Sequence, residues 1–304
     1  MLSVRDAFFY SIYEQIKKGE DYYIITADLG APSLDDLRKY YPDRYISVGI
    51  AEQSLIAISA GLAMAGHKVI AYGLNPFPVT RAYDQIKSVI AGMNIPITIC
   101  GLNAGLCSAE AGYTHVPVED FCMMRLLPNI EMYNPTDCTL AKLLGDTTGC
   151  MEYPRFIRFD KKLGEKIYEK DDINLSRGFA VFGNNRAKVS IITLGIFVAD
   201  MRRLADKYKN QIKVIDIFKM KPNEEKLAEE IAESKEILTV EENMLQGGIG
   251  SFLLEMLSDR KIIIPVSRIG VRLMPYNVFT NRDYIQKDQQ LDIEHIEKVI
   301  QKLI

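Results

Sequence analysis

The sequence lacks the short motifs that identify several large enzyme classes. Its 304 residues contain no GxxxxGKS or GxxxxGKT phosphate loop, no GxSxG nucleophile elbow and no HExxH metalloprotease motif. It has three histidines and five cysteines, and the cysteines form no CxxC pair, so the spacing of a zinc site is missing. We therefore expect no metal site built from this chain alone.

The sequence also has no large excess of positive or negative charge and no long hydrophobic run. Lys and Arg number 37 against 40 Asp and Glu, so no basic excess is present and nucleic-acid binding is not expected. No stretch approaches the roughly 18 consecutive apolar residues of a membrane span, and the first residues do not resemble a signal peptide. Together with the unpaired cysteines, which indicate reduced thiols, these features predict a soluble cytoplasmic protein without a membrane partner.

What the sequence does contain is a strand–helix alternation that is typical of an α/β protein. Apolar residues make up 48% and charged residues 25%, as in globular chains with a substantial core. Alternation of this kind favours mainly parallel sheets covered by helices on both faces. In the first half, strands are expected at 22–26, 45–48, 68–72, 95–100, 130–133 and 156–158, and helices at 4–18, 52–65, 81–92, 119–126 and 137–149.

A change of composition separates this half from a second α/β region. From residue 160 to 186 the chain is charged and rich in turn residues, with room for one short edge strand. We predict domains at 1–160 and 187–304, joined by a linker at 161–186. In the second domain, strands are expected at 189–194, 212–217, 237–240 and 262–266, and helices at 197–208, 223–234, 248–257 and 292–303.

Several residues outside the expected core could carry chemistry, although each has a structural alternative. Glu52 follows a strand and opens an apolar helix, where an acid complements the helix dipole without any function. The same position is where open α/β sheets place ligands, and a partly desolvated carboxylate there could hold or deliver a proton. Phe77, between two prolines, is either a lid over the core or a rigid stacking platform.

The remaining candidates come later in the chain. The long Gly- and Ala-rich stretch 101–121 contains His115, which is either a helix-entry residue or part of a site. Arg158 ends a strand and is either a surface charge or a grip for a carboxylate or phosphate. The glycines of 240–251 resemble a phosphate cradle but lack the GxGxxG spacing, so strand–helix packing explains them better than nucleotide binding.

Five motifs occur together in an order that resembles a known family. Their order and spacing are similar to the C-terminal half of transketolase and of 1-deoxyxylulose-5-phosphate synthase, and the resemblance covers nearly the whole chain. That half holds a pyrimidine-binding domain and a C-terminal transketolase domain. The motifs are VGIAEQ (48–53), RAYDQI (81–86), GYTHVPVED (112–120), LLPNIEMYNPTD (126–137) and VEEN with GGIGS (240–251).

The resemblance implies one subunit of a split enzyme. In this family a GDG motif on another domain binds Mg²⁺ and the diphosphate of thiamine diphosphate, and no GDG occurs in this chain. The implied activity is transfer of a two-carbon ketol unit between sugar phosphates, with Mg²⁺ and diphosphate held mainly by an N-terminal-section partner. The family builds its site across protomers, which implies a homodimer or a heterotetramer and a chain that is inactive alone.

The resemblance also assigns roles to individual residues. Glu52 matches the glutamate that hydrogen-bonds the aminopyrimidine ring, and Phe77 is similar in its spacing to the stacking aromatic. Asp28 matches an acid near the cofactor, and Arg81 opens the RAYDQI motif beside it. Protonation of the ring through Glu52 would favour the tautomer that activates the cofactor.

On the substrate side, His115 matches a histidine that contacts substrate oxygens, and Arg158 matches an arginine that binds the substrate phosphate. The sequence also departs from the family in ways that bear on specificity. Ala111 replaces an aspartate that contacts a sugar hydroxyl, and Glu110 could substitute for it. Asn103 and Ser54 stand where the synthase has Arg and His, respectively.

Two other interpretations stay open at this point. One is a decarboxylating relative, similar to the synthase or to the beta subunit of a 2-oxo-acid dehydrogenase. The other is a non-catalytic paralogue that serves as a structural partner. RAYDQI and THVPVED favour the transketolase side, and retention of Glu52, Phe77 and His115 favours a catalytic role.

Overall fold

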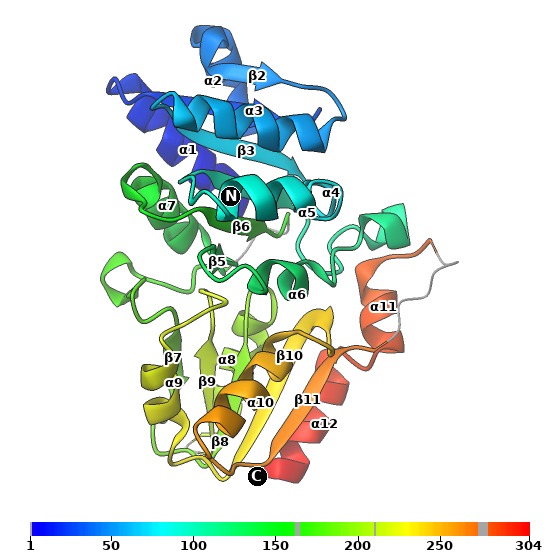
Figure 1. Cartoon of the computed structure of the whole chain (residues 1–304). Coiled ribbons are helices and arrows are strands. Elements are labelled where there is room, and N and C mark those ends of the chain that lie inside the picture. Colours follow the sequence, from blue (N-terminus) through cyan, green and yellow to red (C-terminus); the bar gives the residue numbers. More distant parts are fainter. Residues whose placement is uncertain (1, 162–164, 210, 273–278) are drawn as a thin grey trace. The chain divides into compact units, whose positions relative to one another are not determined.

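The computed structural model describes residues 2–161, 165–209, 211–272 and 279–304 (Figure 1). Contacts divide the chain into two compact units, each of which is discontinuous in sequence. Unit 1 comprises Met1–Ala104 and Met123–Lys170, and unit 2 comprises Gly105–Cys122 and Asp171–Ile304. Residues 162–164 of the predicted linker lie outside the described residues. The domain boundaries at 160 and 187 stay a prediction. Residues 105–122 lie within the predicted first domain, but their contacts place them in unit 2.

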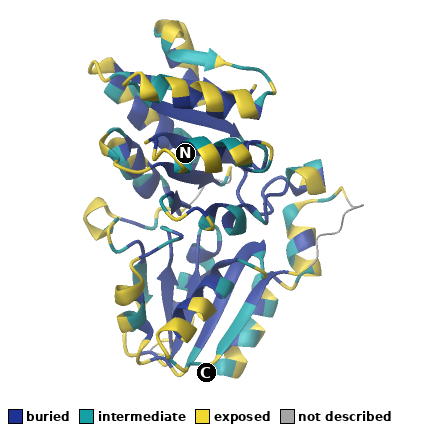
Figure 2. Ribbon diagram, in the orientation of Figure 1, coloured by how far each residue is buried: buried dark blue, intermediate teal, exposed yellow. Residues whose placement is uncertain are grey.

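Unit 1 is built on a sheet of six strands that are all parallel, in the order β2-β1-β3-β4-β6-β5. The strands β4 and β6 are buried at every position, which requires cover on both faces. Figure 2 shows the same pattern, with buried strands and exposed residues on the outward sides of the helices. The strands are β1 Tyr22–Thr26, β2 Tyr45–Ser47, β3 Lys68–Leu74, β4 Thr98–Leu102, β5 Glu131–Tyr133 and β6 Arg155–Phe159.

The helices of unit 1 form two packed groups. One group pairs α1 with α7, and the other packs α3 against α4, α5 and a π-helical stretch at Ile86–Ala91. An aromatic cluster holds α1 to the sheet, since the ring of Phe9 lies 4.8 Å from that of Tyr72 and the ring of Phe8 lies 5.3 Å from that of Phe159. The helices are α1 Val4–Lys17, α2 Asp35–Tyr40, α3 Glu52–Met64, α4 Phe77–Thr80, α5 Tyr83–Gln85, α6 Asp120–Arg125 (which crosses the boundary between the units) and α7 Cys138–Thr147.

Unit 2 contains a sheet of five strands in the order β11-β10-β8-β9-β7. All its pairs are parallel except that of β7 with β9, and β7 is the short edge strand expected near the end of the linker. The strands are β7 Ala180–Gly183, β8 Val189–Thr193, β9 Ile212–Asp216, β10 Glu236–Met244 and β11 Val266–Val271. The helices are α8 Phe197–Lys207, α9 Glu224–Ile231, α10 Ile249–Asp259, α11 Arg282–Asp288 and α12 Ile293–Leu303.

The predicted fold class is confirmed, whereas two predicted elements differ in detail from the structure. The strand expected at 262–266 begins only at Val266, because Pro265 has no N–H for a sheet ladder and Ile263 is 97% exposed. The single helix expected at 81–92 is divided into α5 and the π-helical stretch. Among the described residues, every helix is too short or too polar to traverse a lipid bilayer.

The buried carboxylate of Asp137 connects the start of α7 to the segment that follows β6. Asp137 is 1% exposed and caps α7, because its Oδ1 accepts a hydrogen bond of 2.9 Å from the backbone N–H of Leu140. Its other oxygen accepts from the N–H groups of Ile167 and Tyr168, at 2.8 and 2.9 Å. The side chain therefore holds both the start of a helix and the segment that follows the sheet.

We predict that Asp137→Ala lowers the free energy of unfolding by about 2–4 kcal/mol, because a helix cap is lost and two further N–H groups lose their acceptor. The matched control is Asp292→Ala, which removes only the cap that α12 receives at the N–H of His295 and should cost about 1 kcal/mol. Urea unfolding followed by circular dichroism measures both. Equal losses in the two variants would contradict the role assigned to Asp137.

Candidate functional site

The predicted site residues of unit 1 gather at the carboxyl edge of its sheet. Asp28 follows the end of β1, Glu52 opens α3 after β2, and Phe77 opens α4 after β3. Because all the strands are parallel, these three connections emerge at the same edge. This edge is where open α/β sheets place their ligands.

Glu52, Arg81 and Phe77 form a contacting group. Glu52 is 5% exposed, and its Oε2 accepts a hydrogen bond of 3.1 Å from Nη1 of Arg81. The Arg81 guanidinium also lies over the Phe77 ring, with its central carbon 4.0 Å from the ring centroid. Beside the group is a hollow of about 340 Å³ lined by Ile50, Ala51, Glu52, Gln53, Ser54 and Arg81.

This group can hold a planar, hydrogen-bonding ring. The guanidinium of Arg81 is itself planar, and it both stacks on Phe77 and bonds to Glu52. An aminopyrimidine ring would need the same two contacts, a stacking face and a carboxylate. The Arg81 side chain is 48% exposed, so water partly screens its ion pair with Glu52. The ion pair therefore contributes little to holding the Arg81 side chain in place. A carboxylate has two oxygens with about four acceptor positions, so Glu52 keeps capacity for a ligand.

Asp28 is presented to solvent at the same edge. It is exposed and has a left-handed backbone conformation, with φ of 49°. The hydroxyl of Thr26 braces this turn, because it donates to the carbonyl of Leu29 at 2.6 Å and accepts from the N–H of the same residue. The turn therefore fixes the backbone from which the Asp28 carboxylate projects.

Arg158 lies deeper than a surface charge would. It is 3% exposed within β6, and its Nε donates a hydrogen bond of 2.8 Å to Oδ1 of Asn134. Strand β4 separates β6 from β3, so Arg158 comes from a different part of the edge than Phe77. The sequence analysis missed Asn134, although its place in the NPTD stretch directly after β5 is the signal that could have identified it as a residue of the carboxyl edge.

His115 and Glu110 belong to unit 2, with the whole segment Gly105–Cys122. Glu110 is exposed on the turn Ala109–Ala111. His115 is half-buried, and its Nδ1 lies 2.9 Å from the hydroxyl of Thr114. Burial raises the pKa of nearby Glu119, which lies in the same GYTHVPVED motif as His115 but is not among the site residues that the sequence predicts.

The three positions that the sequence analysis expects to depart from the resembled family differ in their surroundings. Asn103 is buried in a left-handed conformation, and its N–H donates to the carbonyl of Phe159 at 2.9 Å. An asparagine tolerates that conformation better than most residues. Ser54 is exposed in the first turn of α3, and Ala111 is half-buried.

In the glycine-rich stretch of unit 2, a side chain of the same stretch occupies the N-terminus of the helix that could otherwise bind a phosphate. Glu241 accepts hydrogen bonds from the N–H groups of Ile249 and Gly250, at 2.7 and 2.9 Å, and so occupies the N-terminus of α10. A Cβ on Gly248 would lie 2.4 Å from Oε2 of Glu241, which explains the glycine by close packing. A carboxylate stands where a phosphate would bind, so this stretch offers no nucleotide cradle.

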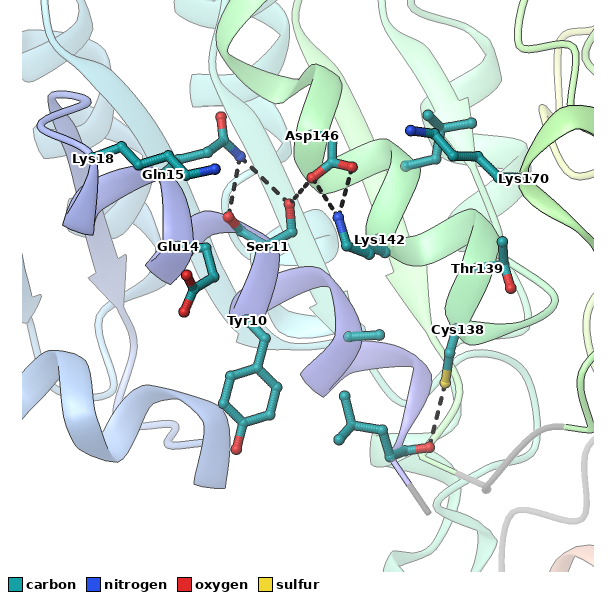
Figure 3. Close-up of a pocket in the computed structure, with 13 residues that line it drawn as sticks. Tyr10, Ser11, Glu14, Gln15, Lys18, Cys138, Thr139, Lys142, Asp146 and Lys170 are labelled. Carbon is teal, nitrogen blue, oxygen red and sulfur yellow. Dashed lines mark hydrogen bonds and ion pairs between the residues drawn. The ribbon is translucent and has the colours of Figure 1, made fainter.

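A larger pocket, of about 640 Å³, lies between α1 and α7 (Figure 3). Its polar side chains bond largely to one another, since the Ser11 hydroxyl donates to Asp146 at 2.6 Å and the Lys142 ammonium contacts both oxygens of that carboxylate. Burial alone would raise the pKa of Asp146, but the bonds from Lys142 and Ser11 outweigh it and lower the pKa. None of the predicted site residues lines this pocket. In the described ranges, no group of three or more His, Cys, Asp or Glu could hold a metal ion.

Comparison with known protein families matches both halves of the chain. The transketolase pyrimidine-binding domain matches residues 1–165, and the transketolase C-terminal domain matches residues 179–296. Together the two matches account for most of the sequence.

Relatives of similar length are named as parts of a divided enzyme. The chain is 30% identical over 280 residues to a subunit of the apulose-4-phosphate transketolase of Phocaeicola vulgatus, with 89% of this chain and 88% of the relative covered. It is 28% identical over 299 residues to a putative transketolase C-terminal section of Methanocaldococcus jannaschii, with 95% and 92% covered. A 1-deoxy-D-xylulose-5-phosphate synthase of Caldanaerobacter subterraneus is 32% identical over 275 residues, but the match covers only 44% of that longer protein.

The fold has a solved counterpart along its full length. A split gene transketolase, solved as an inactive beta4 tetramer, superimposes with a TM-score of 0.86 and 24% identity over 100% of this chain and 98% of that one. From these matches and the architecture of both units, the chain belongs to the transketolase family, and it corresponds to that family's pyrimidine-binding and C-terminal domains.

Proposed function

We propose that this chain is the C-terminal subunit of a split transketolase that depends on thiamine diphosphate. In this proposal it transfers a two-carbon ketol unit between sugar phosphates, in a site completed by an N-terminal-section partner that holds Mg²⁺ and the diphosphate. The observation that carries the proposal is the buried carboxylate of Glu52, in contact with Arg81 and beside Phe77 at the carboxyl edge of a parallel sheet. The names of two relatives, each a subunit of a transketolase, support the need for a partner.

The residues at this edge fit half of the cofactor. Phe77 offers an aromatic face, and Glu52 offers a carboxylate oxygen to a ring nitrogen. When bound, thiamine diphosphate supplies the nucleophilic carbon that allows a bond next to a carbonyl to break and form. In this scheme Glu52 holds a proton at the pyrimidine ring nitrogen, Arg81 lies beside Glu52 as its ion-pair partner, and Asp28 lies near the cofactor.

The substrate side of the proposal rests on His115 and Arg158. An imidazole can donate to the hydroxyl and carbonyl oxygens of a sugar and can accept from its hydroxyl groups, and the hydroxyl of Thr114 orients the Nδ1 of His115. A guanidinium suits a phosphate, and Asn134 orients that of Arg158. Glu110 is the candidate for the sugar hydroxyl that Ala111 can no longer contact. Apulose 4-phosphate, named for two relatives, is therefore a substrate to test together with the common ketose phosphates.

We predict that Glu52→Gln lowers turnover of the assembled enzyme by about 100-fold or more, because Gln cannot share a proton with the pyrimidine ring. The measurement is the rate of ketol transfer with partner and cofactor present. Glu224→Gln is the matched control, since it makes the same substitution in the first turn of α9, where Glu224 also has an arginine partner, Arg260. Unchanged turnover in Glu52→Gln would remove the catalytic assignment and favour a non-catalytic paralogue.

A second prediction concerns the divided cofactor site. Calorimetric titration of thiamine diphosphate with Mg²⁺ should give no tight binding to this chain alone and clear binding to an equimolar mixture with a GDG-bearing partner. The reason is that the groups expected to hold the metal and the diphosphate lie on the partner. Tight binding to the isolated chain would show that this division is wrong.

The exposed side of α3 suggests how copies of the chain associate. Ile58 and Met64 on α3 are 40% and 63% exposed, and Ile50 just before the helix is 73% exposed. Exposed apolar side chains on the outward side of a helix are a feature of interfaces. We infer that this side pairs with a second copy, in a homodimer when the chain is alone or in a heterotetramer with its partner.

We predict that Ile58→Glu weakens self-association by at least about 10-fold, because a charge would be buried without a partner. Light scattering at micromolar concentration measures the effect. Ile263→Glu, at an almost fully exposed position in unit 2, is the control and should leave the oligomer unchanged. A wild-type chain that is monomeric in this assay would rule out the interface.

Decarboxylation is the second candidate reaction, because synthases of 1-deoxy-D-xylulose 5-phosphate are 32–34% identical over most of this chain. Pyruvate consumption with release of CO₂ would favour that branch. Consumption of phosphorylated ketoses without CO₂ would favour ketol transfer.

A further inference from the structure

The segment that carries His115 is part of the core of unit 2. Leu106, Ala109, Val116 and Val118 are buried in the same apolar cluster as the residues of β8 to β11. The backbone of Met244, at the end of β10, donates a hydrogen bond of 2.9 Å to the carbonyl of Val118. The segment is therefore fixed at its far end by packing and by a strand.

At its near end the segment meets a buried carboxylate, Glu242. The Oε2 of this β10 residue accepts a hydrogen bond of 3.1 Å from the backbone N–H of Leu106. Arg282 of α11 donates from Nη2 to the same oxygen at 2.6 Å and from Nε to Oε1 at 2.8 Å. Gln286 of the same helix donates to Oε1 at 2.7 Å. Both oxygens are thus engaged, and the arginine contact has the bidentate geometry of a strong pair.

The backbone approaches this carboxylate so closely that a glycine is required. Gly105 has a φ of +57°, and a Cβ there would lie 2.6 Å from Oε2 and 2.8 Å from Cβ of Glu242. The entrance of the segment is therefore shaped around Glu242.

Consecutive tight turns connect this entrance to the histidine. Backbone bonds run from the N–H of Ala111 to the carbonyl of Ser108 at 2.9 Å, and from the N–H of His115 to the carbonyl of Gly112 at 3.0 Å. These bonds restrain the backbone between Leu106 and His115, so we expect a shift at the entrance to move the imidazole as well.

We propose that Glu242 is a positioning residue that, with Arg282 and Gln286, sets the place of the His115 segment. Its consequence for catalysis rests on the function proposed above, whereas its hold on the segment does not. Glu242 touches neither cofactor nor substrate in this scheme, and it acts through the backbone of Leu106.

The adjacent Glu241 provides a matched control. It is also buried on the same strand, but its carboxylate binds the N–H groups of Ile249 and Gly250 at the start of α10. Glu241→Gln and Glu242→Gln therefore make the same isosteric change at neighbouring positions that hold different parts of unit 2.

The test is amide hydrogen exchange of the full chain. Glu242→Gln should accelerate exchange in the peptide 105–118 by about 10-fold to 100-fold, because a charge-assisted bond is lost, and should leave α10 unchanged. Glu241→Gln should give the opposite pattern. Unchanged exchange in 105–118 of Glu242→Gln would overturn the proposal, as would equal acceleration across all of unit 2.

Activity of the assembled enzyme gives the second readout. Glu242→Gln should lower kcat by about 10-fold or more while thiamine diphosphate binding by calorimetry stays within about twofold, because the cofactor contacts proposed for this chain lie in unit 1 and the others lie on the partner. Normal kcat despite faster exchange would overturn the positioning role. A wild-type enzyme without ketol transfer would instead count against the proposed function, and hydrogen exchange would still decide whether Glu242 holds the segment.

Discussion

Parallel pairing in the sheet of unit 1 is the constraint on which the candidate site depends. Strands that all run in one direction deliver their carboxyl ends to one edge, and the chain returns each time through a helix on a face of the sheet. Glu52, Phe77 and Arg158 come from separate parts of the chain and reach that edge for this reason. Because the central strands are buried on both faces, their side chains pack in the core or, as with Arg155 and Arg158 of β6, pair with neighbouring polar groups.

Buried carboxylates form a second recurring feature. Several of them accept hydrogen bonds from backbone N–H groups, and Glu242 also pairs with an arginine. Asp137 caps one helix and holds the segment behind the sheet, and Glu241 closes the N-terminus of another helix. Glu242 binds an N–H group and an arginine at once. Glu52 differs from these three, because it lines a hollow and its arginine partner is half-exposed. That difference distinguishes an acid available to a ligand from acids that stabilise the fold.

Local patterns predict most of the fold. The strand Tyr22–Thr26 has the bounds that the sequence predicts, because a short β-branched and aromatic run between turn residues has few alternatives. The position of Glu52 and Phe77 at the carboxyl edge can also be predicted from the sequence, since each residue follows a strand of the parallel sheet. The bonds of Glu242 could not be predicted, because Leu106 and Arg282 are far from it in sequence and meet only through packing. The same holds for residues 105–122, because nothing in their local sequence indicates that their apolar side chains pack against the sheet of unit 2.

That placement makes the two units inseparable as genetic modules. The core of unit 2 includes Leu106, Val116 and Val118, yet strands of unit 1 precede and follow these residues along the chain. During synthesis residues 105–122 leave the ribosome well before β8 to β11 do. Their apolar side chains can be buried in the core of unit 2 only after those strands have been synthesised. A fragment that begins after the linker would lack part of its own interior. Recombination at the linker would therefore exchange an incomplete unit.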